Sequence, residues 1–147
     1  MDISQLNVGD EVKSAEFLRI TQERVDQFAE VTEDFQWIHL DQARCEQQSP
    51  FKTTIAHGFL TAALMPKMFS ACFTIDPSKY TMLNYGVDSL RYLEPVRVND
   101  HINYSFVLKE IEQKPLGALY KFAATVEIQE RDKPALIGTF LMLLVKN

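Results

Sequence analysis

The sequence of 147 residues has little of what marks several common protein classes. Its formal net charge of −5 shows no basic excess, which argues against a nucleic-acid-binding protein. Only five glycines and six prolines are present, and no segment repeats at a fixed period, so low-complexity and repeat architectures are excluded. The hydrophobic content of 46% is enough for one sizeable core. The sequence therefore predicts a single domain over residues 1–147.

Long hydrophobic runs and a cysteine framework are also missing. The longest apolar-rich segment, residues 58–73, is interrupted by Lys67 and Pro66 and is too short to span a bilayer. The N-terminus lacks the charged-then-apolar pattern of a secretory signal. The two cysteines, Cys45 and Cys72, have no metal-ligand spacing and are better interpreted as reduced thiols than as a disulfide. We expect a cytoplasmic protein with no membrane partner.

The first half of the chain carries helical patterns on either side of an irregular stretch. A short strand to about Leu18 precedes an amphipathic helix from Gln22 to about Thr32. Residues 33–56 show no sustained period, and irregular stretches of this length are usually functional or disordered. Apolar residues such as Trp37 and Phe51 argue against disorder, so we expect a functional stretch. Residues 57–73 are apolar on nearly all sides, which predicts a buried helix that Pro66 kinks or divides.

The second half has the pattern of an antiparallel sheet. The alternating residues Ile102, Tyr104, Phe106 and Leu108 point to one face, and residues 119–130 alternate in the same way. The last segment, 135–146, is apolar on both faces, as a covered central strand would be. Strands following a helix predict an α+β fold in which the sheet curls around the buried helix. The sheet's second face or edge then needs a cover, for which another subunit is one candidate.

Asp34 and His39 form the first candidate site. Five positions place two residues about 140° apart on an ideal helix, so they meet only if the helix ends near Asp34 and the chain turns back. An aspartate and a histidine can hold one water between them and exchange protons with it. Apolar neighbours such as Phe35 and Trp37 would shield the pair from solvent. Spacing alone leaves the alternative open that the two residues are unrelated.

His57 and Gly58 stand at the start of the apolar helix and form the second candidate. The first N–H groups of a helix lack internal partners, so a substrate carbonyl could accept a hydrogen bond from Gly58 N–H. Glycine also lets a ligand approach the backbone, although it could simply ease entry into a buried helix. His57 is either a further base or, more commonly, a structural residue. Residue types permit a metal on Asp34, His39 and His57, but the spacing matches no metal motif, so we expect none.

Together these residues resemble a known family. The segment from Phe28 to Pro66 is similar to the hydratase signature of the MaoC-like dehydratases, the (R)-specific enoyl-CoA hydratases. That signature has an Asp, four residues, a His, an acidic residue two positions on, and an Ala-His-Gly helix start, here Asp34, His39, Asp41 and residues 56–58. The segments "QWIH", "TIAHGFLT" and "LNYGVDSLRYLEPVRVND" resemble the NodN-like subgroup more closely still. The resemblance covers about residues 22–100.

The resemblance implies a hotdog fold, in which an antiparallel sheet wraps around a long central helix, usually in a homodimer or higher homo-oligomer. It implies that Asp34 and His39 activate a water and that Gly58 N–H polarises a thioester carbonyl. The reaction would be hydration of a trans-2-enoyl thioester to an (R)-3-hydroxyacyl thioester, or its reverse. Acyl-CoA or acyl-carrier-protein thioesters would be the substrates, and no metal or redox cofactor is implied.

The sequence departs from the family's pattern in two places. Gln36-Trp37 stands where the hydratases have asparagine-proline, and Gln36 is a candidate to fix the water or the loop. Pro66 falls near the position of a serine that supports the aspartate, for which Thr61 or Ser70 are candidate substitutes.

Two other functions fit the same resemblance: a non-catalytic acyl-thioester-binding hotdog protein and a hotdog thioesterase. A binding module has no chemical need of both Asp34 and His39, which favours the hydratase. Arg91, Arg97 and Lys121 are candidates for phosphate contacts, although a solvated surface is the better explanation for each of them.

Overall fold

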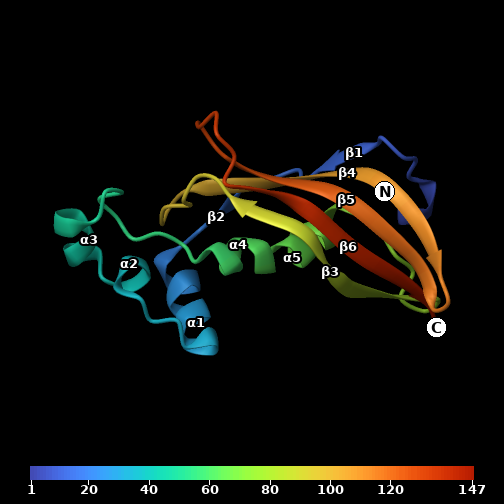
Figure 1. Cartoon of the computed structure of the whole chain (residues 1–147), viewed down its shortest axis with the longest axis horizontal. Coiled ribbons are helices and arrows are strands. Elements are labelled where there is room, and N and C mark those ends of the chain that lie inside the picture. The colour runs from blue at the N-terminus through green and yellow to red at the C-terminus, as the bar shows by residue number, and fades with distance from the viewer.

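The computed structural model describes all residues, 1–147. A curved sheet covers one side of a central pair of helices, three further helices gather at one end, and both termini lie towards the other (Figure 1). In chain order the elements are η1 (Ile3–Gln5), β1 (Glu11–Lys13), β2 (Leu18–Arg19), α1 (Gln22–Thr32), α2 (Trp37–Leu40), α3 (Gln42–Gln48), α4 (Gly58–Ala63), α5 (Met65–Cys72), β3 (Tyr80–Tyr92), β4 (His101–Lys114), β5 (Gly117–Ile128) and β6 (Leu136–Lys146).

The sheet is antiparallel throughout, with strand order β1-β4-β5-β6-β3 and β2 also paired to β4. The predicted alternation is confirmed, because Ile102, Tyr104, Phe106 and Leu108 are all fully buried on the concave face. The ring of Phe69 on α5 packs against Phe73, Phe106, Phe122 and Phe140 at centroid distances of 4.4–6.0 Å. This aromatic cluster fills the space between the helix and the sheet.

The central helix is divided, as the proline predicted. Leu64 keeps a helical backbone between α4 and α5 and donates its N–H to Leu60 O. Pro66 lies in the first turn of α5, where its missing N–H leaves no intrahelical bond unmade and its fixed φ suits the helix. The two segments therefore follow one another along nearly one line beneath the sheet (Figure 1).

Strand β6 is buried on both faces, again as predicted. Phe140, Met142 and Leu144 belong to the main core, while Leu141 and Leu143 form a small cluster with Leu119 on the convex face. Neighbouring β3 pairs only with β6, and its other edge has no partner strand in the chain. It exposes five large hydrophobic side chains, those of Tyr80, Leu83, Tyr85, Val87 and Tyr92.

Two local predictions were wrong. Residues 33–56 are not irregular throughout, because they contain α2 and α3. Helix α2 has four residues and fully buries only His39, so it is too short to produce a period in the sequence. Helix α3 is capped by Asp41, which accepts a hydrogen bond from Arg44 N–H.

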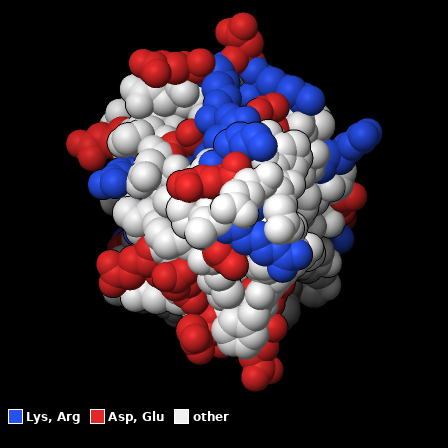
Figure 2. Space-filling view, turned by 90° about the vertical axis from the view of Figure 1, so that its left-hand side faces the viewer, with Lys and Arg blue, Asp and Glu red and all other residues white.

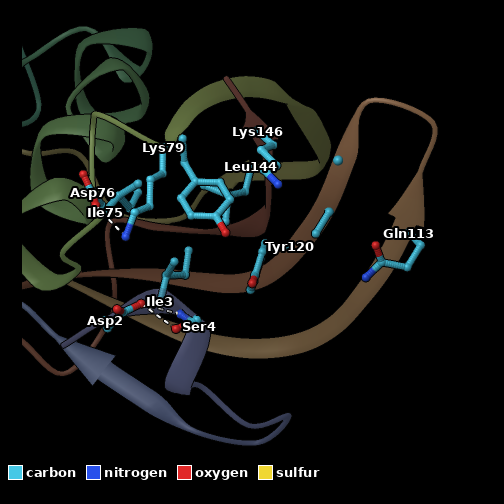
Figure 3. Close-up of a pocket in the computed structure, with 13 residues that line it drawn as sticks. Asp2, Ile3, Ser4, Ile75, Asp76, Lys79, Gln113, Tyr120, Leu144 and Lys146 are labelled. Carbon is cyan, nitrogen blue, oxygen red and sulfur yellow. Dashed lines mark hydrogen bonds and ion pairs between the residues drawn. The ribbon is translucent and has the colours of Figure 1, made fainter.

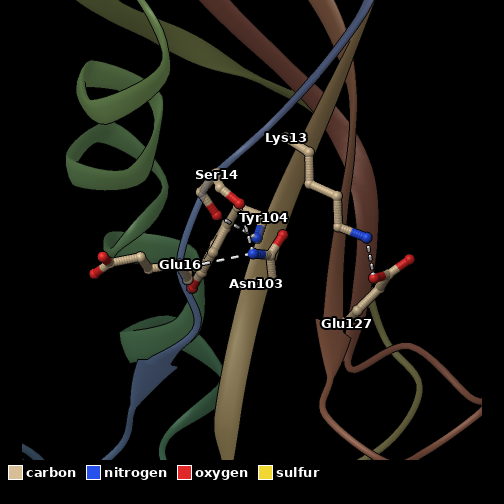
Figure 4. Close-up of polar contacts among 6 residues, drawn as sticks. All are labelled: Lys13, Ser14, Glu16, Asn103, Tyr104 and Glu127. Atoms are coloured by element: carbon tan, nitrogen blue, oxygen red, sulfur yellow. Dashed lines mark hydrogen bonds and ion pairs between the residues drawn. The ribbon is translucent and has the colours of Figure 1, made fainter.

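The single N-terminal strand expected to end near Leu18 is instead two short strands that both pair with β4. The link between them leaves the sheet. The buried Asn103 amide holds it by donating to the carbonyls of Ser14 and Glu16, and Tyr104 N–H donates to Ser14 Oγ (Figure 4). None of the helices has the length and hydrophobicity needed to cross a bilayer.

Candidate active site

The chain turns back directly before Asp34. Helix α1 ends at Thr32, and Glu33 adopts a left-handed backbone with φ of 60°. Asp34 then lies in the link to α2, which carries His39. An Asp34 carboxylate oxygen and one ring nitrogen each from His39 and His57 lie within 4.8 Å of one another. A water with two hydrogen bonds of about 2.8 Å can bridge up to about 5.6 Å, so one water can contact both Asp34 and His39.

The buried His39 ring is fixed in one tautomer. Its Nδ1 lies 2.7 Å from Ile55 O, and because a carbonyl only accepts hydrogen bonds, Nδ1 must carry the proton. Nε2 is then the nitrogen left to accept a proton. Burial lowers the pKa of His39, an effect opposed by its hydrogen bond to Ile55 and by the charge of Asp34, and reinforced by the neighbouring His57. The ring is therefore held in the form that a base requires.

His57 is packed between two rings. It stacks on His39 with 3.8 Å between centroids and 22° between planes, and Phe28 packs against it with 5.0 Å between centroids. Its Nε2 lies 3.0 Å from the main-chain oxygen of Asp34. Its Nδ1 is buried and has no hydrogen-bond partner. The structure thus brings His57 into contact with both members of the candidate pair.

Gly58 is the first residue of α4, so its N–H has no acceptor within the helix. A Cβ at this position would lie 2.9 Å from the Tyr92 ring. The space left by the missing side chain is therefore filled by Tyr92, rather than open to a ligand as the sequence suggested. Glycine is needed here because β3 places an aromatic ring against the helix start.

A cavity of about 250 Å³ contains the predicted residues. It is lined by Asp34, His39, His57 and Gly58, together with Phe28, Thr32 and Phe59. Phe28 and Phe59 also line an adjoining apolar groove of about 490 Å³ between α4–α5 and β3, with Pro66 in its wall. On the other side of His39 and Gly58 lies a third space of about 200 Å³, lined in part by Thr61, Tyr92 and Glu94. The site thus adjoins an apolar groove on one side and a small, largely apolar recess on the other.

The supporting residues expected from the sequence lie at different distances from the site, and only some of them contribute to it. The exposed Gln36 contributes through its main chain, because its N–H lies 3.4 Å from Asp34 Oδ1 and its carbonyl accepts from His39 N–H. Its side chain does not line the cavity, so a direct role in fixing a water is not supported. Of the two hydroxyl candidates, Thr61 lines the recess beside His39, whereas Ser70 is exposed on α5 and lines none of the three spaces.

His39 is buried, but the expected apolar shielding of Asp34 is absent from the single chain. Asp34 is exposed, Phe35 is 51% exposed, and Trp37 packs against Arg44 instead. Among the phosphate candidates, Lys121 is already paired with Glu110 and Glu112. Sequence reasoning missed the roles of Phe28 and Tyr92, since no local pattern connects either residue to the helix start that it packs against.

The surface around the site carries charges of both signs. Figure 2 shows the end of the molecule formed by α1–α3, where most Lys and Arg lie in the upper half, while Asp and Glu lie along the lower edge and also at the top. A further cavity of about 480 Å³ lies at the opposite end of the sheet, lined in part by Ile3, Tyr80, Tyr120 and Lys146 (Figure 3). It contains none of the predicted site residues.

Comparison with known proteins places the chain in a class. Residues 4–130 match the family model described as MaoC like domain. The chain is 35% identical over 147 residues to Nodulation protein N of Rhizobium meliloti, covering 99% of this chain and 91% of that protein. It is 36% identical over 138 residues to 3-hydroxyacyl-thioester dehydratase Z of Mycobacterium tuberculosis, covering 93% and 90%.

The solved structure of R-hydratase PhaJ1 from Pseudomonas aeruginosa has a TM-score of 0.78 at 24% identity, covering 98% of this chain and 85% of that one. Fold and relatives together define the class as a hydratase or dehydratase with the hotdog fold. The chain belongs to the MaoC-like dehydratase family. The fold and family predicted from the sequence are thereby confirmed.

Proposed function

We propose that this protein adds water across the double bond of trans-2-enoyl thioesters to give (R)-3-hydroxyacyl thioesters, or catalyses the reverse dehydration. One observation carries the proposal: Asp34, His39 and Gly58 line a single cavity that opens onto an apolar groove. A carboxylate, an unprotonated imidazole nitrogen and a main-chain N–H are the groups that activation of water and polarisation of a carbonyl require.

The chemistry follows from these groups. Asp34 and His39 hold the water, and Asp34 takes one of its protons as the oxygen bonds to C3. Electrons of the C2–C3 bond move towards the thioester carbonyl, whose developing negative charge accepts the hydrogen bond of Gly58 N–H. The proton reaches C2 through the Asp34–His39 pair. The hydroxyl group of the water is then bonded to C3 and its proton to C2. The acyl chain lies in the apolar groove, where Phe59 and Pro66 would contact it.

This scheme uses no metal or redox cofactor. Asp34, His39 and His57 are close enough to suggest a metal site, but the two imidazole planes are stacked within 22°. Lone pairs lie in the ring planes, so stacked rings direct them side by side rather than towards one ion. His57 Nε2 is also engaged with Asp34 O. We therefore assign a water, not a metal, to this cluster.

We further propose that the protein works as a homodimer in which two β3 edges pair. The unpaired edge and the exposed Leu83, Tyr85 and Val87 support this arrangement. Gly86, Val87 and Leu90 of β3 line the apolar groove, so a partner on this edge would close it. Phe28 and Phe59 line both this groove and the cavity of Asp34, so the same partner would also help to shield the site.

The test is a panel of trans-2-enoyl thioesters of increasing chain length, offered as CoA and carrier-protein forms. Hydration is followed as loss of enoyl absorbance, and the configuration of the product at C3 is determined. We expect turnover with an (R) product for at least one chain length. An absence of turnover across the whole panel would refute the enzymatic function.

A further inference from the structure

We propose that His57 is a positioning residue for the Asp34–His39 pair, acting as a neutral imidazole that anchors the Asp34 main chain and holds the His39 ring. The inference rests on the proposed function for its catalytic consequence. The geometry of His57 can nevertheless be tested without turnover.

The hydrogen bond to Asp34 fixes the tautomer of His57. Asp34 O can only accept, so the proton of the neutral ring is on Nε2, 3.0 Å away. Nδ1 then carries a lone pair, and it is buried without a partner. A proton on Nδ1 would leave a buried cationic N–H with no acceptor, which is strongly unfavourable. The surroundings thus select the neutral form with its proton on Nε2.

This is the hydrogen bond that joins Asp34 to a distant part of the chain. The other hydrogen bond of Asp34 is the long one, 3.4 Å, that its carboxylate accepts from Gln36 N–H within its own turn. His57, by contrast, belongs to the start of the buried central helix and is 3% exposed. The rigid core therefore sets the position of the exposed Asp34 through His57.

Through stacking, His57 also fixes the position of the His39 ring. The His39 ring is held at one edge by Ile55 O and on one face by His57. Phe28 of α1 packs against the His57 ring in turn. When His39 shares a proton during turnover, a second cation at a ring separation of 3.8 Å would repel it, so an uncharged ring at His57 suits this role.

His57 is not placed to act on the substrate. Its Nε2 is engaged with Asp34 O, and its Nδ1 is inaccessible. It therefore acts through Asp34 and His39, which distinguishes it from a second catalytic base.

Two variants of matched chemistry test the anchor. His57→Gln places an amide N–H near the position of Nε2, whereas the shorter His57→Asn places it near Nδ1, out of reach of Asp34 O. Both lack the stacked ring and neither can be protonated. We expect kcat to fall about tenfold in His57→Gln and about 100-fold in His57→Asn, because misplacement by about 1 Å can cost about 10²-fold. KM should change less than about threefold in both variants.

If His57 had a purely structural role at the helix start, His57→Asn would be expected to retain more activity than His57→Gln. His57 is the N-cap residue of α4 and makes no side-chain capping bond. Asparagine is a preferred N-cap residue and glutamine is not, so His57→Asn should be the more stable variant. If Asn retains as much activity as Gln, or if both variants change KM and leave kcat intact, the anchor is refuted. His101→Gln, at the start of β4, is the control.

Ring ¹⁵N–¹H spectra of the histidines in the wild-type protein give a readout independent of activity. We expect the Nε2-protonated tautomer for His57 and the Nδ1-protonated tautomer for His39 at pH 7.5. Detection of Nδ1–H or of a cationic ring at His57 would overturn the inference. If the spectra agree and the wild-type protein hydrates no thioester, the geometry of His57 stands and the proposed function fails.

Discussion

The sheet half of the molecule and the helical end that carries the site are held together by different forces. Around Phe69 the contacts are apolar and numerous, and their energy depends on how well the core is filled. At the other end, polar side chains bind main-chain oxygens: His39 to Ile55, His57 to Asp34, and the Gln22 amide to His39 O. Such bonds set directions, so a small number of them positions the site without contributing much to stability.

This contrast predicts that the two regions respond differently to substitution. Changes in the sheet half should lower stability and leave the chemistry of folded molecules intact. Changes at the helical end should lower the rate more than the stability.

The largest effect is expected at the pair itself. Asp34→Asn and His39→Gln should each reduce kcat about 10²–10⁴-fold, the usual contribution of a general acid or base. Circular dichroism should show an unchanged fold. Asp132→Asn, on an exposed loop, and His101→Gln serve as matched controls. Full rates in both site variants would show that Asp34 and His39 do not act on the water.

In the core, Phe69→Ala should lower the free energy of unfolding by about 3–5 kcal/mol, the range for truncating a buried aromatic ring. Denaturant titration measures the loss, and the rate per folded molecule should stay near that of the wild type. Phe17→Ala removes a ring that is 40% exposed and should cost far less. Equal losses in the two variants would contradict the central place of Phe69 in the core.

Gln22 offers a finer test, because its amide donates to His39 O and accepts from Thr54 Oγ. Gln22→Ala should cost about 1–3 kcal/mol of stability, the usual penalty for unpaired buried polar groups. It should also lower kcat, since the main chain at His39 loses a support. Gln27, exposed on the same helix, gives the control substitution Gln27→Ala. Identical rates for the two variants would show that the hydrogen bond does not position His39.

The smallest expected effect is a change of the protein's stability with pH. Burial lowers the pKa of His39 in the folded protein, so the unfolded state binds the proton more readily. The contribution of His39 to stability is then fully present above its unfolded pKa of about 6.5 and is lost as the pH falls towards the folded value. Unfolding midpoints between pH 5 and 8 should show this loss on acidification, and the loss should be smaller in His39→Gln. A His39→Gln variant with an unchanged pH profile would contradict it.

The same contrast explains what the sequence could predict. Alternation along residues 102–108 reports directly on one face of a strand, and the apolar surface of residues 58–72 reports on a buried helix. The contact between His57 and Asp34 O joins positions far apart in the chain and leaves no periodic signal. Tyr92 against Gly58 is of the same kind. Helix α2 was missed because four residues make little more than one turn.

The central claim is that water is added to the acyl chain, and isotopic water tests it most directly. The wild-type protein is incubated with a trans-2-enoyl-CoA in H₂¹⁸O, and the products are analysed by mass spectrometry and chiral chromatography. We predict one ¹⁸O atom at C3 of an (R)-3-hydroxyacyl-CoA whose thioester remains intact. Label in the carboxylate of a released free acid would instead identify a thioesterase and contradict the account.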